Sequence, residues 1–115
     1  MKKAALVLAL LFVVLMPLNV SAASRLTTIN PSLGFDGTTA KCDVVVLGNK
    51  TSDYIEVTMK LMNGSSCIAM WTDDGYGYVH INERASVAKN VTYTLVVEVK
   101  INNVALTPVS VSEKC

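Results

Sequence analysis

Few residues of this 115-residue chain could carry out chemistry, because it has three cysteines and one histidine. A cysteine nucleophile needs a base within hydrogen-bonding reach, and His80 is the candidate base. No local pattern links His80 to Cys42, Cys67 or Cys115. The cysteines and the histidine also lack the paired spacing of zinc ligands. We therefore expect no enzymatic activity, no metal ion and no other cofactor.

The aspartates offer a second kind of site, which would bind calcium. Asp36, Asp73 and Asp74 are the aspartates that lie in predicted turns. A dedicated calcium loop alternates its oxygen ligands along the chain, and this rhythm is missing here. Two aspartates before Gly75 are typical of a turn. The sequence therefore predicts a turn at 73–75 and no calcium site.

Aromatic side chains cluster around this predicted turn. Trp71, Tyr76 and Tyr78 follow one another closely, and Tyr54 lies one predicted strand away. In one interpretation, Trp71, Tyr76 and Tyr78 form a ligand face on which sugar rings stack. In the other, Trp71 fills the core and the tyrosines cover its rim. Tyr76 stands between two glycines, and we expect it to be exposed.

Strands are predicted to position all of these residues. Apolar and polar residues alternate with a period of two, which is typical of strands with one buried face. The predicted strands cover residues 25–30, 39–47, 54–62, 67–72, 78–81, 85–87, 92–101 and 104–112. Pro31 ends the first strand, and Pro108 interrupts the last, which suits an edge strand. About seven short strands joined by turns predict one all-β domain at 24–115, an immunoglobulin-like β-sandwich, with a small barrel as the alternative.

A secretory signal peptide is predicted at residues 1–23. Lys2 and Lys3 precede an unbroken apolar run at 4–16, and small residues follow at 20–23. A basic head, an apolar run and a small-residue cleavage site are typical of such a peptide. The run is shorter than the ~20 residues that a membrane-spanning helix needs. We therefore expect a secreted, extracellular protein without membrane contact after cleavage.

The charge balance excludes one class of partner. The chain has ten basic and nine acidic residues, and cleavage would remove two of the lysines. The mature domain is then nearly neutral and has no basic cluster. Nucleic-acid binders need a basic surface that neutralises phosphates. We expect the partner to be a protein or a carbohydrate, and the chain to be a monomer.

The three cysteines form an odd set in a compartment that favours disulfides. Cys42 alternates in phase with apolar residues, so we expect it to be a free, buried thiol. Cys67 follows a turn and Cys115 is the last residue, and an immunoglobulin-like topology places both towards the same pole. We expect a bridge between Cys67 and Cys115. An intermolecular disulfide through Cys115 is the alternative.

Four segments of the predicted mature domain share a further pattern. They are Thr-Ala-Lys-Cys at 39–42, Ile-Glu-Val-Thr-Met-Lys-Leu at 55–61, Trp71 after a hairpin, and Val-Ala-Lys-Asn-Val-Thr-Tyr at 87–93. In these segments the chain resembles a group of small secreted proteins of Gram-positive bacteria, most of them uncharacterised. The resemblance implies an immunoglobulin-like sandwich. It implies no catalytic residues, because that group has no established activity.

Two functions agree with these observations. The first, which we prefer, is a small secreted binding or interaction module without catalysis, whose ligand is a glycan or a surface protein. The second is a secreted effector, such as a toxin or a protease inhibitor, that acts through an edge strand or a turn. The first is preferred because aromatic residues flank the predicted turns and no catalytic set accompanies them.

Overall fold

The computed structural model of the chain describes residues 27–115. The predicted signal peptide at 1–23 lies outside the described residues. The strands are β1 (Thr28–Asp36), β2 (Thr39–Leu47), β3 (Tyr54–Asn63), β4 (Ser66–Tyr76), β5 (Tyr78–Ser86), β6 (Thr92–Ile101), β7 (Val104–Ala105) and β8 (Val109–Lys114). The all-β class that the sequence predicts is confirmed for this part of the chain.

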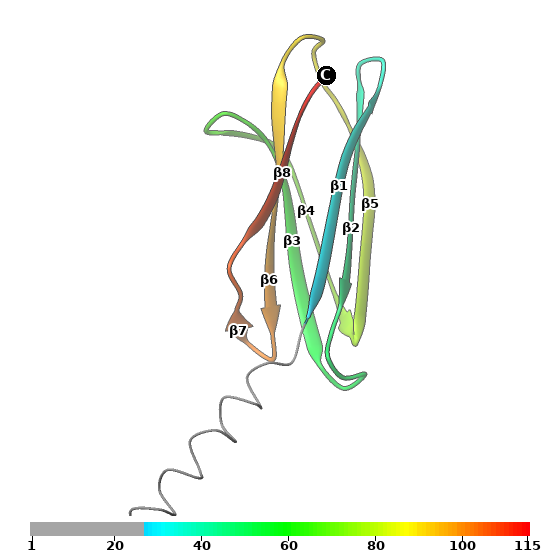
Figure 1. Cartoon of the computed structure of the whole chain (residues 1–115), viewed down its shortest axis with the longest axis vertical. Coiled ribbons are helices and arrows are strands. Elements are labelled where there is room, and N and C mark those ends of the chain that lie inside the picture. The colour runs from blue at the N-terminus through cyan, green and yellow to red at the C-terminus, as the bar shows by residue number, and fades with distance from the viewer. Residues whose placement is uncertain (1–26) are drawn as a thin grey trace, which may run out of the picture.

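The strands form two antiparallel sheets that lie face to face (Figure 1). Sheet A has the order β1-β2-β5. Sheet B has the order β4-β3-β6, and both β7 and β8 pair with β6. Hairpins join β1 to β2 and β3 to β4, whereas the connections β2–β3, β4–β5 and β5–β6 cross between the sheets. The architecture is therefore that of a β-sandwich.

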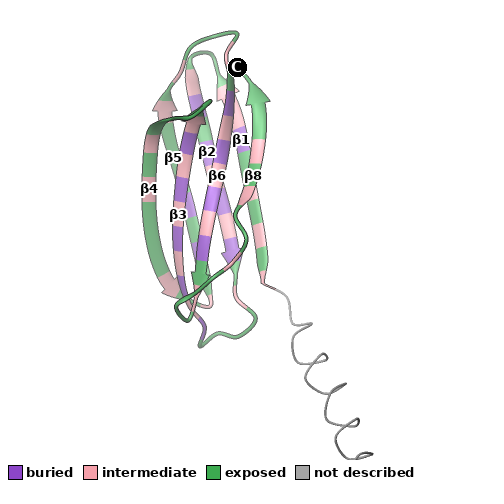
Figure 2. Cartoon of the chain, turned by 90° about the vertical axis from the view of Figure 1, so that its left-hand side faces the viewer, coloured by how far each residue is buried: buried purple, intermediate pink, exposed green. Residues whose placement is uncertain are grey.

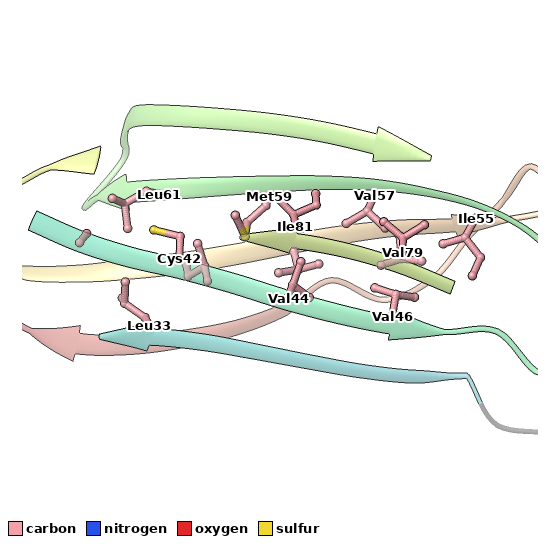
Figure 3. Packing of buried hydrophobic residues seen from close by; sticks show 14 of the residues in the cluster. Leu33, Cys42, Val44, Val46, Ile55, Val57, Met59, Leu61, Val79 and Ile81 are labelled. Atoms are coloured by element: carbon pink, nitrogen blue, oxygen red, sulfur yellow. The ribbon is translucent and has the colours of Figure 1, made fainter. Parts of the chain in front are cut away.

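The core lies between the sheets, where inward-facing residues of β1, β2, β3, β5 and β6 meet (Figure 3). β3 and β6 show the alternation most clearly, because every second residue of these central strands is buried. The buried apolar residues are Leu33, Ala40, Cys42, Val44, Val46, Ile55, Val57, Met59, Leu61, Val79, Ile81, Tyr93, Leu95, Val97 and Val99. Burial of this apolar surface holds the sheets together and leaves the opposite face of each sheet to solvent.

The start of the chain differs from the sequence-based expectation. The strand predicted at 25–30 begins at Thr28, continues through Pro31 and ends at Asp36, where a turn-rich connection was expected. Pro31 lies opposite Val44 of β2. β1 is an edge strand, and an edge tolerates proline because one side of it makes no ladder hydrogen bonds. The connection shrinks to a tight turn at Gly37, whose φ of +61° favours glycine.

β4 also runs further than expected, through the predicted turn at 73–75. All three of these residues pair with β3, and the strand ends at Tyr76. The turn prediction is wrong here because β3 extends far enough to offer each of them a ladder partner. The chain turns instead at Gly77, which has a φ of +74°. This shift places Asp73 and Asp74 on a sheet.

The other strands lie close to their predicted positions. The bounds of β2 and β6 are those expected, and β3 is one residue longer. The two segments predicted at 78–81 and 85–87 form the single strand β5, because the residues between them pair with β2. Pro108 separates β7 from β8, as the interruption predicted.

Tyr93 fixes the connection between β5 and β6. Its ring is buried at the start of β6 and packs against Phe35 of β1, with the ring centroids 6.0 Å apart. Its hydroxyl accepts a hydrogen bond from the backbone N–H of Ala88, with N···O 2.8 Å. Ala88 lies in the connection itself, so this bond ties the connection to the core.

Asp53 plays a similar part at the other end of the sandwich. The residue is only 8% exposed. Its carboxylate accepts hydrogen bonds from the N–H of Lys50 at 3.0 Å and from the amide group of Asn102 at 3.2 Å. The Lys50 N–H, helped by the Asn102 amide, holds the pKa of Asp53 below its usual value. Asp53 thereby ties the β2–β3 connection to the turn after β6.

Candidate functional site

In β3 and β6 of sheet B, buried residues alternate with less buried ones (Figure 2), and most of the less buried residues are polar and lie on the outer face of the sheet. In a β-sheet, residues that are directly opposite on neighbouring strands present their side chains on the same face. Two such rows cross sheet B: Asp74, Glu56 and Lys100 form one, and Thr72, Thr58 and Glu98 form the next. The face therefore presents carboxylates, hydroxyls and one amine side by side.

A groove of about 790 Å³ runs over these two rows. Asp73 and Asp74 of β4 line one side of it, and Ala105, Leu106 and Pro108 line the other. This second wall lies where β7 ends and pairing with β6 is interrupted at Pro108, before β8 resumes it. We call this site the sheet B groove.

Two tyrosines lie beside the row of Asp74, on the strands that carry the sheet B groove. Tyr54 and Tyr76 are directly opposite one another, and their ring centroids are 5.2 Å apart. Tyr76 is 71% exposed. The Tyr54 hydroxyl donates a hydrogen bond to the Asp74 carboxylate, and this bond raises the pKa of Tyr54 to about 12. The bond holds the carboxylate next to the aromatic pair.

The charge of the sheet B groove is mainly negative. Asp74, Glu56 and Glu98 supply three carboxylates on this face, and Lys100 is the amine among the lining residues. Glu98 also pairs with a lysine outside the lining, Lys60, with N···O 2.6 Å. This hydrogen bond to Glu98 raises the pKa of Lys60. The groove can accept hydrogen bonds from hydroxyl or amine groups of a ligand.

The ligand face predicted from Trp71, Tyr76 and Tyr78 is divided among three surfaces. Tyr76 lies on the outer face of sheet B. Tyr78 is 52% exposed and lies opposite Leu47 on the outer face of sheet A. Trp71 is partly buried against the core and lines a different groove, between β4 and β5. The three side chains therefore do not share one face, because β4 continues past Trp71 and the chain changes sheets at Gly77.

The predicted bridge between Cys67 and Cys115 is absent, and all three cysteines are free thiols. Both residues lie towards the same pole, as expected, but on strands at opposite sides of sheet B. Cys67 of β4 is directly opposite Met62 of β3, and Met62 is opposite Thr94 of β6. Thr94 is in turn opposite Ser112 of β8, the strand that leads to Cys115. Three strand spacings amount to roughly 14 Å. Cysteines whose Cα atoms are more than about 7 Å apart cannot be bridged without backbone movement.

The three thiols have different surroundings. Cys42 is 0% exposed, and burial raises its pKa to about 11. Cys67 is exposed, and its Sγ–H donates to the carbonyl oxygen of Ala69 at 3.4 Å. Cys115 is partly buried, and its Sγ–H donates to the carbonyl oxygen of Gly37 at 3.3 Å. The expected placement of Cys42 as a free, buried thiol agrees with this geometry.

Sequence reasoning missed the contact between Tyr54 and Asp74. Alternation through β4 places Asp74 and Tyr76 on the same face as Tyr54, but the residues before Gly75 were assigned to a turn. Extending the period of two beyond Trp71 would have found this arrangement. The wall formed by 105–108 had no comparable signal in the sequence.

The described residues contain neither a metal-ion site nor a membrane-spanning helix, and no similar known protein indicates a function. Within residues 27–115, no three His, Cys, Asp or Glu side chains lie close enough together to hold a metal ion. None of the residues that the structure describes forms an apolar helix of membrane-spanning length. No protein family matches the sequence, and no curated protein is similar to it at a significant level.

Proposed function

We propose that the chain is a small secreted binding module without catalytic activity, with an immunoglobulin-like topology and its ligand site in the sheet B groove. Secretion is supported by Lys2 and Lys3, by the apolar run at 4–16 and by the small residues at 20–23. The intact mass of the secreted protein tests this part. Cleavage predicts a first residue of Ala23 or Ser24, and a mass that includes residues 1–23 would contradict it.

Two features support the immunoglobulin-like topology. The first is the strand arrangement, in which β1 and β2 lie in sheet A, β3 and β4 in sheet B, β5 in sheet A and β6 to β8 in sheet B. The second is the bond from Ala88 to Tyr93, because immunoglobulin-type domains often have a tyrosine near the start of the penultimate long strand that bonds back to the preceding backbone. The residue two positions after that tyrosine is a bridging cysteine in antibody domains. Leu95 stands there, which explains why Cys42 has no partner across the sheets.

The ligand that the sheet B groove favours is a carbohydrate. Its lining consists largely of carboxylates and hydroxyls, which accept hydrogen bonds from sugar hydroxyls. The exposed ring of Tyr76 beside Tyr54 offers an apolar surface next to these acceptors. This pairing of an exposed aromatic ring with a fixed carboxylate at Asp74 is the observation that carries the proposal.

Glycan binding tests the proposal. The purified protein is screened on a glycan array and against soluble peptidoglycan fragments, and the best ligand is titrated by NMR. We expect the amide signals of Tyr54, Asp74 and Tyr76 to shift. Tyr76→Ala should weaken binding roughly tenfold, the loss of about 1.4 kcal/mol of aromatic contact.

Tyr78→Ala is the matched control, because this tyrosine is also exposed but lies on the outer face of sheet A. The control should bind the same glycan with unchanged affinity. Binding that depends on Tyr78 and not on Tyr76 would place the site on the other sheet. A folded protein that binds none of the glycans would contradict the carbohydrate proposal.

A further inference from the structure

The free edge of β4 lacks prolines and charged side chains from residue 66 to residue 72, although a bulge interrupts its pairing with β3 between Leu61 and Met62, and Asp73 and Asp74 follow. Among the strands of residues 27–115, β4 pairs only with β3. Proteins often block such edges with prolines or charged side chains. β1 contains Pro31, Pro108 precedes β8, and β5 carries Glu83 and Arg84. Residues 66–72 of β4 contain neither proline nor a charged side chain.

A second groove, of about 480 Å³, lies beside this edge between β4 and β5. We call it the edge groove. Trp71 and Ile81 supply its apolar wall, and Asp73 and Glu83 supply carboxylates. Both acidic residues occupy inward positions, because each pairs with a buried residue of the neighbouring strand. They remain exposed because they lie on the outermost strand of each sheet.

We propose that β4 binds an extended peptide segment of a partner protein as an added strand, and that a basic side chain of this segment enters the edge groove. Strand addition would satisfy the free backbone groups of β4. Alternate side chains of an added strand point to the same face, so one set faces the edge groove and the other lies beside Met70, which is 58% exposed. The partner segment therefore alternates basic and apolar residues.

A basic side chain fits the edge groove for two reasons. The carboxylates of Asp73 and Glu83 attract a cation and can form charge-assisted hydrogen bonds with it. The Trp71 ring offers a surface on which a guanidinium or ammonium group is favoured. His80 also lines this groove, but its imidazole is hydrogen-bonded to Asp43, with N···O 2.8 Å.

A second copy of the same strand fits less well. Residues 66–76 include no lysine or arginine, so a paired β4 could not place a cation in the edge groove. It would instead bring the carboxylate of its own Asp73 to a surface that already carries two. Like charges placed close together oppose such pairing. The charge of the edge groove therefore favours a different protein as the partner.

NMR titration tests the proposal with a short synthetic peptide of alternating valine and arginine. We expect the amide signals of residues 69–75 to shift and their hydrogens to exchange more slowly. The same peptide with glutamate in place of arginine should not bind. Glu83→Gln should weaken binding of the arginine peptide roughly tenfold, as expected for loss of one charge-assisted contact.

Asp73→Asn and Asp74→Asn provide a matched pair on one strand. Asp73 lines both grooves, whereas Asp74 lines only the sheet B groove. Binding of the arginine peptide should fall with Asp73→Asn and stay unchanged with Asp74→Asn. Glycan binding that depends on Tyr76 is a separate measurement, so this inference and the proposed function can fail independently.

Several results would overturn the inference. These are equal effects of Asp73→Asn and Asp74→Asn, binding of the glutamate peptide, shifts confined to other strands, or no shift at millimolar peptide. If the β4 signals change with protein concentration in the absence of peptide, the edge is occupied by a second copy instead.

Discussion

The hydroxyl of Tyr93 should contribute measurably to stability through a single hydrogen bond. Tyr93→Phe keeps the buried ring and removes the acceptor of the Ala88 N–H. Loss of an acceptor for a partly buried donor costs about 1–2 kcal/mol. In a domain of this size, each 1 kcal/mol lowers the melting temperature by about 4–8 °C, so we expect a fall of about 5–15 °C. Circular dichroism melts and urea titrations measure it.

Tyr78→Phe is the control for this experiment. Its hydroxyl lies on the outer face of sheet A, where a surface substitution changes stability by no more than about 0.5 kcal/mol. The urea m-value should be the same for both variants, because neither changes the surface exposed on unfolding. A Tyr93→Phe protein with the same melting temperature as Tyr78→Phe would refute the role of the hydrogen bond.

Three further predictions follow from burial and charge. Leu95→Ala removes a fully buried side chain and should cost about 2–5 kcal/mol in urea denaturation; a smaller loss would argue against the packing of the core. Iodoacetamide should modify Cys67 and Cys115 in the native protein and Cys42 only after unfolding, because burial raises the Cys42 pKa to about 11; a third adduct on the native protein, seen by intact mass, would contradict this. The folded-state pKa of Asp53 is depressed, so the contribution of its carboxylate to stability is present above the unfolded pKa of about 3.9 and is lost as the pH falls through the folded value. When melts at neutral pH are compared with melts at about pH 3, Asp53→Asn should therefore lose less stability than the wild type. Equal losses in the two proteins would contradict this role of Asp53.

Periodicity predicted the strands that are central to a sheet. β2, β3 and β6 each have a strand on both sides and one face in the core, so their alternation is regular and their bounds were found to within a residue. The edge strands were harder to predict. Pro31 and the aspartates at 73–74 resemble the end of a strand, yet an edge tolerates both. Local turn preference was overruled there by a neighbouring strand that offered partners.

The candidate site was predicted only in part. Exposure of Tyr76 and burial of Cys42 follow from strand phase, which the sequence contains. The bridge between Cys67 and Cys115 depended on which strands neighbour one another, and the order of strands across sheet B is not a local property. The same holds for the two grooves, because each is formed by segments that are distant in sequence.

The sandwich is also arranged to resist a pulling force. β1 begins at one pole and β8 ends at the other, next to the C-terminus (Figure 1). Tension between Thr28 and Lys114 would slide β1 along β2 and β8 along β6, so that the hydrogen bonds across each pair are loaded together rather than one at a time. Rupture then requires many bonds to break in one event, which slows forced unfolding.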